Sequence, residues 1–108
     1  MKITEWNQRH VECFPVGEGW RDLVEKMVEK VAKLSPDAYV TCCKEKFGGL
    51  RFYVDGCGEE AWKLVGEAED ESYKICEKCG TREDVTTEGG WLLTLCKTCR
   101  KNREADHD

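Results

Sequence analysis

The sequence has no segment suited to a membrane. No stretch approaches the roughly 18 consecutive apolar residues of a membrane-spanning helix. The first ten residues, MKITEWNQRH, also lack the apolar core of a secretion signal. We therefore expect a cytoplasmic protein with no membrane partner.

Basic charge is scarce relative to acidic charge. The 108 residues hold 17 Lys and Arg against 22 Asp and Glu, for a formal net charge of −5. General electrostatic binding to the phosphates of nucleic acid needs clustered Lys and Arg. The overall balance therefore argues against a nucleic-acid protein, although it is compatible with a local basic patch.

Histidine is almost absent, since His10 and His107 are the only two. A cysteine protease needs a histidine beside its nucleophilic thiol, and a nuclease of the HNH type needs one between its metal knuckles. His10 lies in a segment without a pattern, and His107 lies in the polar end EADHD. The acidic run over 67–71 is typical of a solvated helix face. We expect no enzymatic activity and infer no small-molecule substrate.

Cysteine, by contrast, is abundant, with eight residues. In the reducing cytosol, paired cysteines indicate metal binding or catalysis more often than disulfides. The pattern C-x2-C-x16-C-x2-C has the spacing of a structural zinc site, and the predicted ligands are Cys76, Cys79, Cys96 and Cys99. Iron or an iron–sulfur cluster and a redox pair are the less favoured alternatives, because a redox pair explains neither the second C-x-x-C nor the spacing.

Four thiolates complete a tetrahedral zinc shell and leave no position for water, so the one predicted Zn²⁺ is structural. The segment between the pairs is expected to form a short hairpin turning at Gly89-Gly90, and CKTCRKNRE a knuckle that continues into a helix. This order is typical of a zinc-ribbon or treble-clef module, predicted over 76–104. Residues 105–108 are expected to be a mobile tail.

The remainder, residues 1–75, is predicted to be a small α+β domain on which the module packs. Apolar residues recur at helical spacing over 19–34 and 59–73. Between these segments, two β-rich runs surround Gly48-Gly49, which is a hairpin signal. The predicted fold class is therefore α+β, with two amphipathic helices flanking a β-hairpin and a C-terminal zinc module.

The candidate partner-binding residues are basic or aromatic: Lys44, Lys46, Arg51, Tyr53 and Trp91. A two-residue turn at Gly48-Gly49 would set Lys46 opposite Arg51 and Lys44 opposite Tyr53, a patch that suits an anion or an acidic partner. A three-residue turn would shift the register and dissolve the patch, and the sequence does not choose between them. Trp91 is expected to cover the metal site, and an exposed Trp91 would instead be a binding hot spot.

Further cysteines and basic residues have simpler interpretations. The four cysteines without matching spacing are expected to be buried small hydrophobes, with a second metal site as the alternative: Cys13, Cys42, Cys43 and Cys57. Basic residues close to the predicted ligands are expected to offset the negative charge of a four-thiolate centre: Lys74, Lys78, Lys97, Arg100 and Lys101. We prefer that role for CRKNR over a nucleic-acid contact.

The segments GEGW, KEKFGGLRFYV, AEDESYKICEKCG and GGWLLTLCKTC together resemble a group of small phage and prophage proteins. The resemblance extends from about Cys13 to Cys99 and is most specific in KEKFGGLRFY and GGWLLTLC. It implies a phage origin, and hence the cytoplasm of a host cell, without naming a reaction. In that group the position of Cys99 can hold a histidine, an exchange that fits a zinc ligand.

These features together predict a zinc-stabilised binding or adaptor protein that acts through protein–protein contact. The phage resemblance implies a role in modulating host machinery or defence, which is an argument by analogy. The alternative is a nucleic-acid-binding zinc-ribbon protein of the transcription-factor kind. It would use the basic patch of the hairpin or the CRKNR helix.

Overall fold

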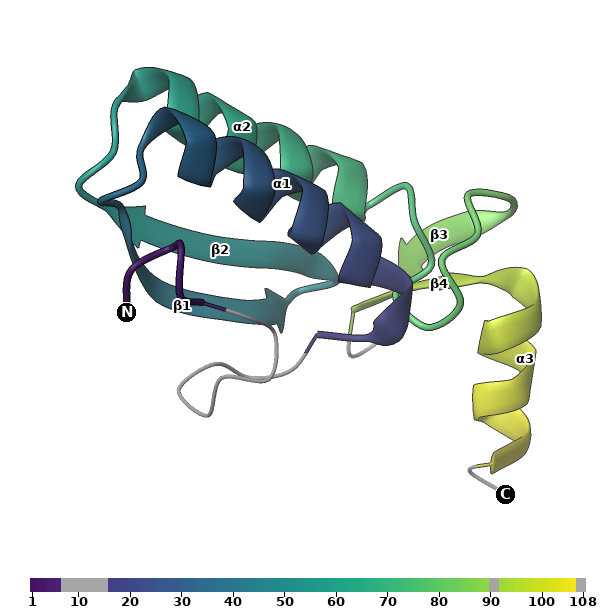
Figure 1. Ribbon diagram of the computed structural model, residues 1–108. Helices are drawn as coiled ribbons and strands as arrows, with labels where there is room; N and C mark the ends of the chain where they lie inside the picture. Colours follow the sequence, from purple (N-terminus) through teal and green to yellow (C-terminus); the bar gives the residue numbers. More distant parts are fainter. Residues whose placement is uncertain (7–15, 90–91, 107–108) are drawn as a thin grey trace.

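The computed structural model describes residues 1–6, 16–89 and 92–106, and these form a mixed α+β fold (Figure 1). His10, Cys13, Trp91 and His107 lie outside the described residues, so the predictions made for them stay untested. None of the described helices is long and apolar enough to cross a bilayer. In chain order the elements are η1 (Glu18–Trp20), α1 (Arg21–Leu34), β1 (Tyr39–Lys46), β2 (Gly49–Asp55), α2 (Glu59–Ser72), β3 (Val85–Glu88), β4 (Leu93–Cys96) and α3 (Lys97–Asp106).

The two helices predicted from apolar spacing are α1 and α2. They flank the β1–β2 hairpin in sequence, but in space they lie side by side over the same face of it (Figure 1). Val24, Met27 and Val31 of α1 are buried, as are Val65 and Ala68 of α2. These side chains share one core with the inward residues of the hairpin, so a helix layer on a sheet supplies most of the apolar burial.

The β1–β2 turn has two residues, but they are Phe47 and Gly48, so the prediction of a turn at Gly48-Gly49 is wrong by one position. Lys46 pairs with Gly49, and Lys44 lies opposite Arg51 instead of Tyr53. Phe47 and Gly48 have φ angles of 54° and 81°, as a type I′ turn requires.

The physical reason for this register is a tertiary contact of the second glycine. A Cβ on Gly49 would lie 2.2 Å from the hydroxyl oxygen of Tyr73. Gly49 is therefore needed for close packing in the strand, and Gly48 supplies the positive φ of the turn.

The second part of the fold begins after α2 and holds the β3–β4 hairpin and α3. β3 and β4 are antiparallel, with Val85 opposite Cys96. The Arg100 side chain of α3 donates hydrogen bonds to the carbonyls of Thr86 and Leu93, at 2.8 and 3.1 Å, and so fastens the helix to the hairpin. α3 runs to Asp106, so the first two residues of the predicted tail are helical and the last two lie outside the described residues.

The two parts are joined through the glycines of the GEGW segment. A Cβ on Gly17 would lie 2.0 Å from the carbonyl oxygen of Glu77, and one on Gly19 would lie 2.0 Å from that of Cys76. The Gly19 N–H donates to the Glu77 carbonyl at 3.0 Å, and the buried Trp20 indole donates to the Ile75 carbonyl at 2.9 Å. The start of the first helix therefore lies directly against the loop that follows Ile75.

Candidate metal centre

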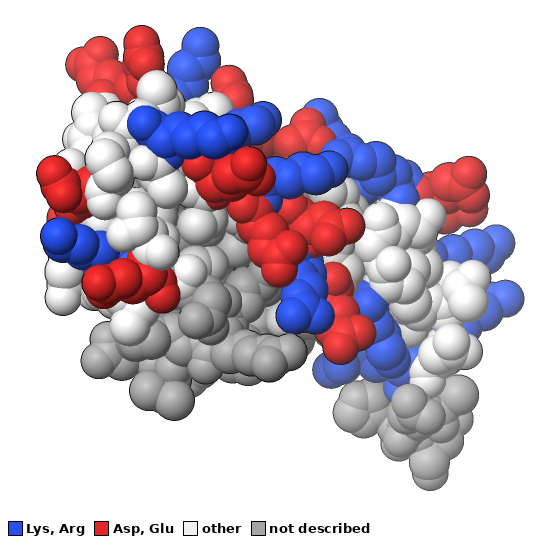
Figure 2. All heavy atoms as spheres, viewed as in Figure 1, with Lys and Arg blue, Asp and Glu red and all other residues white. Residues whose placement is uncertain are grey.

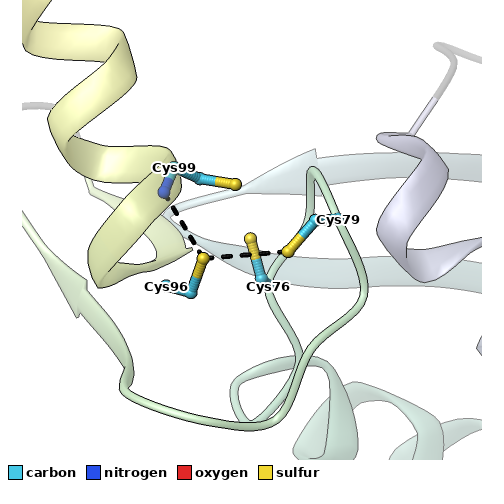
Figure 3. A group of neighbouring side chains, drawn as sticks. All are labelled: Cys76, Cys79, Cys96 and Cys99. Carbon is cyan, nitrogen blue, oxygen red and sulfur yellow. Dashed lines mark hydrogen bonds between the residues drawn. The ribbon is translucent and has the colours of Figure 1, made fainter.

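The four predicted ligands come together in space. The sulfur atoms of Cys76, Cys79, Cys96 and Cys99 all lie within 4.8 Å of one another. Cys79 Sγ and Cys96 Sγ are 3.7 Å apart, close to the separation of about 3.8 Å that tetrahedral zinc with bonds of about 2.3 Å imposes. Figure 3 shows Cys76 and Cys79 on the loop after α2, Cys96 directly before α3 and Cys99 in the first turn of α3.

In each C-x-x-C pair, a local backbone turn brings the two cysteines close together. The Gly80 N–H donates to the Cys76 carbonyl at 2.9 Å, and Gly80 has a φ of 84°, a conformation that favours glycine. This tight turn returns Cys79 to Cys76. In the second pair, Cys96 ends β4 and Cys99 lies in the first turn of α3, where its N–H donates to Cys96 Sγ at 3.4 Å.

The electrostatics of the thiols favour a bound cation. Burial raises the pKa of the Cys76 thiol, but backbone N–H groups of Cys79, Cys96 and Lys78 outweigh this and lower that pKa to about 6. Burial and then the neighbouring thiols raise the pKa of Cys99 to about 12. Without a cation only part of the cluster ionises, because like charges this close repel one another. A metal ion would let all four thiols deprotonate.

The donor set therefore fits one metal ion such as zinc. All four donors are cysteine sulfurs, three of them from buried residues, with Cys79 at the surface. Within the described part of the chain, no other group of three or more potential ligands lies close enough together to hold an ion. Cys42 and Cys57 are half-buried and Cys43 is buried, away from this centre.

A cavity of about 500 Å³ lies beside the centre, between the loop that carries Glu77 and helix α3. One carboxylate oxygen of Glu77 is buried there without a hydrogen-bond partner. Burial, and then the nearby carboxylate of Glu45, raises the pKa of Glu77 to about 7. Between its ordinary pKa and this raised value, the Glu77 carboxyl is therefore protonated in the folded protein and ionised in the unfolded chain.

The wild type should therefore lose folding stability as pH rises, and Glu77→Gln should remove this loss. A raised folded-state pKa means that folding stability falls as pH rises from the ordinary value of 4.5 through about 7. Allowing for partial solvent exposure, we expect the variant to gain about 1–2 kcal/mol over wild type near pH 8 and nothing near pH 4. Denaturation of both metal-loaded proteins across this range measures the difference, and a constant difference would contradict the assignment.

The hairpin places the other candidate residues on one side. Cross-strand partners share a face and neighbours alternate, so the register puts these basic and aromatic side chains, with Cys42 and Asp55, on the face away from the core: Tyr39, Lys44, Lys46, Arg51 and Tyr53. We call these the outer hairpin face. Arg51 forms an ion pair with Glu69 and a hydrogen bond to the Tyr73 hydroxyl, so its charge is largely neutralised within the fold.

Phe47 is a residue that the sequence analysis missed. It lies at the tip of this hairpin with 64% of its surface exposed and a φ of 54°. The Lys46 ammonium lies 5.4 Å from the centre of its ring. A bulky residue directly before two glycines, in a turn where Asn or Gly is usual, is the sequence signal that could have identified it.

Comparisons with known proteins give no relative from which a role could be taken. No protein-family model matches the chain, and no curated protein or solved structure matches it significantly. The resemblance to small phage proteins therefore stays a prediction. The function has to be inferred from the chain's own residues.

Proposed function

We propose that this protein is a zinc-stabilised binding module without enzymatic activity, and that it contacts a protein partner through the outer hairpin face. The observation that carries the proposal is the exposure of aromatic rings along this hairpin. Tyr39, Phe47 and Tyr53 are 53%, 64% and 44% exposed. Aromatic side chains are enriched in protein interfaces and supply most of their hot spots.

The structural role of zinc is supported by the order of elements. A C-x-x-C loop, a hairpin and a helix follow one another in the order expected of a treble clef, with Cys76 and Cys79 before the hairpin, Cys96 at its end and Cys99 in the helix. Cysteine sulfurs are preferred ligands of zinc, and four protein donors leave no position for water or substrate. Elemental analysis should find one zinc per chain.

The resemblance to phage proteins supports a host protein as the partner, in the cytoplasm of an infected cell. Binding there would modulate host machinery or a defence system. Nothing in this step depends on catalysis, because a tight contact alone can block or redirect a partner.

A nucleic-acid partner is the second candidate, favoured by a local charge excess. Residues 74–103 hold seven Lys and Arg against four Asp and Glu, although the whole chain is acidic. Lys and Arg side chains gather around α3 (Figure 2). The negative thiolate centre offsets part of this charge, and Arg100 is engaged with backbone carbonyls. We therefore rank this candidate second.

The proposed function is tested on the outer hairpin face with a matched surface control. The double variant Lys44→Ser/Tyr53→Ser should lose a protein that the wild type captures from host lysate. Trp62→Ala, an exposed aromatic on α2, should retain it. Quantitative mass spectrometry of the captured proteins, followed by calorimetry with the purified partner, measures the loss.

Two results would overturn this proposal. One is that no protein is captured more by wild type than by the double variant. The other is salt-sensitive binding of single- or double-stranded oligonucleotides, measured by fluorescence anisotropy, that the α3 variant Lys97→Ser/Lys101→Ser abolishes. The second result would establish the nucleic-acid candidate instead.

A further inference from the structure

The tip of the β1–β2 hairpin combines backbone strain with exposure. A positive φ is a rare and costly conformation for a bulky side chain such as Phe47. The ring is mostly exposed, so burial in the core does not compensate for the strain. Strained positions of this kind are concentrated at ligand clamps and binding sites.

The tip is also held firmly in place from beneath. The Gly48 N–H donates to the Glu45 carboxylate at 2.8 Å, and the Gly48 carbonyl accepts a hydrogen bond from the buried hydroxyl of Thr94. The Thr94 carbonyl in turn accepts from the N–H of Glu77 at 3.0 Å, next to the ligand Cys76. The metal-binding part therefore fixes the turn, and a rigid anchor loses little entropy on binding.

The charge around the Phe47 ring indicates which kind of partner surface the ring would contact. Lys46 holds its ammonium 5.4 Å from the centre of the Phe47 ring, and Lys44 shares the same face. Arg51 is paired with Glu69, and Asp55 lies at the far end of the face, opposite Tyr39. The two lysines therefore dominate the charge that the tip end of this face offers a partner. An exposed ring flanked by cations is complementary to an apolar pocket rimmed by carboxylates.

We infer that Phe47 is the anchor of the interface and inserts into an apolar pocket bordered by acidic side chains of the partner protein. The inference rests on the proposed function, because it specifies the partner's chemistry at the same hairpin. A second copy of this acidic chain is the main competing occupant, and the experiment separates the two.

The probe is a displayed library of random short peptides, selected against the zinc-loaded wild type. We expect the selected peptides to combine apolar residues with Asp or Glu. Phe47→Asn should weaken their binding by roughly 30-fold or more, as loss of a hot spot does, and Lys46→Glu should weaken it at least about tenfold. Trp62→Ala should leave it unchanged.

Unfolding is controlled within the same experiment. Asn suits the turn conformation, so Phe47→Asn should keep its zinc and show an unfolding midpoint at least as high as wild type. A loss of binding with these two values retained supports the anchor role directly.

Several outcomes would overturn the inference. Peptides that bind Phe47→Asn as well as wild type would remove Phe47 as the anchor while leaving protein binding by another surface intact. Basic peptides would contradict the acidic rim. A concentration-dependent dimer of the wild type that Phe47→Asn abolishes would identify a second copy as the occupant. No selected peptide, together with oligonucleotide binding, would remove the proposed function itself.

Discussion

Removal of the metal ion is expected to unfold the protein from Cys76 through α3. The apolar core of this part consists of Cys76, Leu95, Cys96 and Cys99, so three of its four buried apolar residues are candidate ligands. Structural zinc contributes about 10–16 kcal/mol in small peptides, whereas whole domains are stable by only about 5–15 kcal/mol. The remaining apolar contacts of the module cannot replace that contribution.

A chelator titration followed by amide hydrogen exchange measures this effect. Protection should be lost first in β3, β4 and α3, while α1 and α2 retain theirs longer. Cys76→Ser should reproduce the loss without chelator, and Cys42→Ser, half-buried outside the centre, should keep its zinc and its protection. An exchange pattern that chelation leaves unchanged would contradict the structural role of the ion.

Acidification should release the ion because protons compete with it for the thiolates. Cys99, whose pKa is raised to about 12 by burial and neighbouring thiols without a metal, is the least favourable of these thiols to ionise. Cys99→His should retain zinc, since a histidine nitrogen is also a tetrahedral zinc ligand.

Features that depend on local spacing were predictable from the sequence. The cluster of four cysteines follows from two C-x-x-C pairs, and the helices follow from apolar residues recurring at helical intervals, so both were placed close to their observed positions. Each C-x-x-C pair and each helix is determined by residues only a few positions apart in the sequence. The α+β class follows from the same local signals.

Features that depend on contacts between distant residues were not predictable. The turn of the first hairpin was misplaced because two adjacent glycines give equal local signals, and they differ only in their tertiary contacts: Gly48 lies against Thr87 and Gly49 against Tyr73. Arg51 was expected to face a partner, but its ion pair with Glu69 spans 18 positions. Phe47 has no periodicity to identify it, because an exposed turn residue follows no pattern of burial.

Gly19→Ala should be the most damaging small substitution outside the ligands. A Cβ at this position would lie 2.0 Å from the Cys76 carbonyl oxygen and 2.6 Å from the Gly80 nitrogen. Both are backbone atoms of the metal-binding loop, so relief of the clash requires the loop itself to move. We expect a loss of about 3 kcal/mol or more of stability, at the upper end of overpacking effects, together with weaker zinc binding because Cys76 and Cys79 share that loop.

Denaturant unfolding at saturating zinc measures the first effect, and competition with a chromophoric chelator measures the second. Gly66→Ala is the matched control: Gly66 lies within α2, where a Cβ would meet nothing within 4 Å, so this change should stabilise the protein by up to about 1 kcal/mol. If Gly19→Ala weakened stability but left zinc affinity unchanged, the loop would be able to move without disturbing its sulfurs. The coupling between the first helix and the metal centre would then be refuted, because that coupling requires both quantities to fall together.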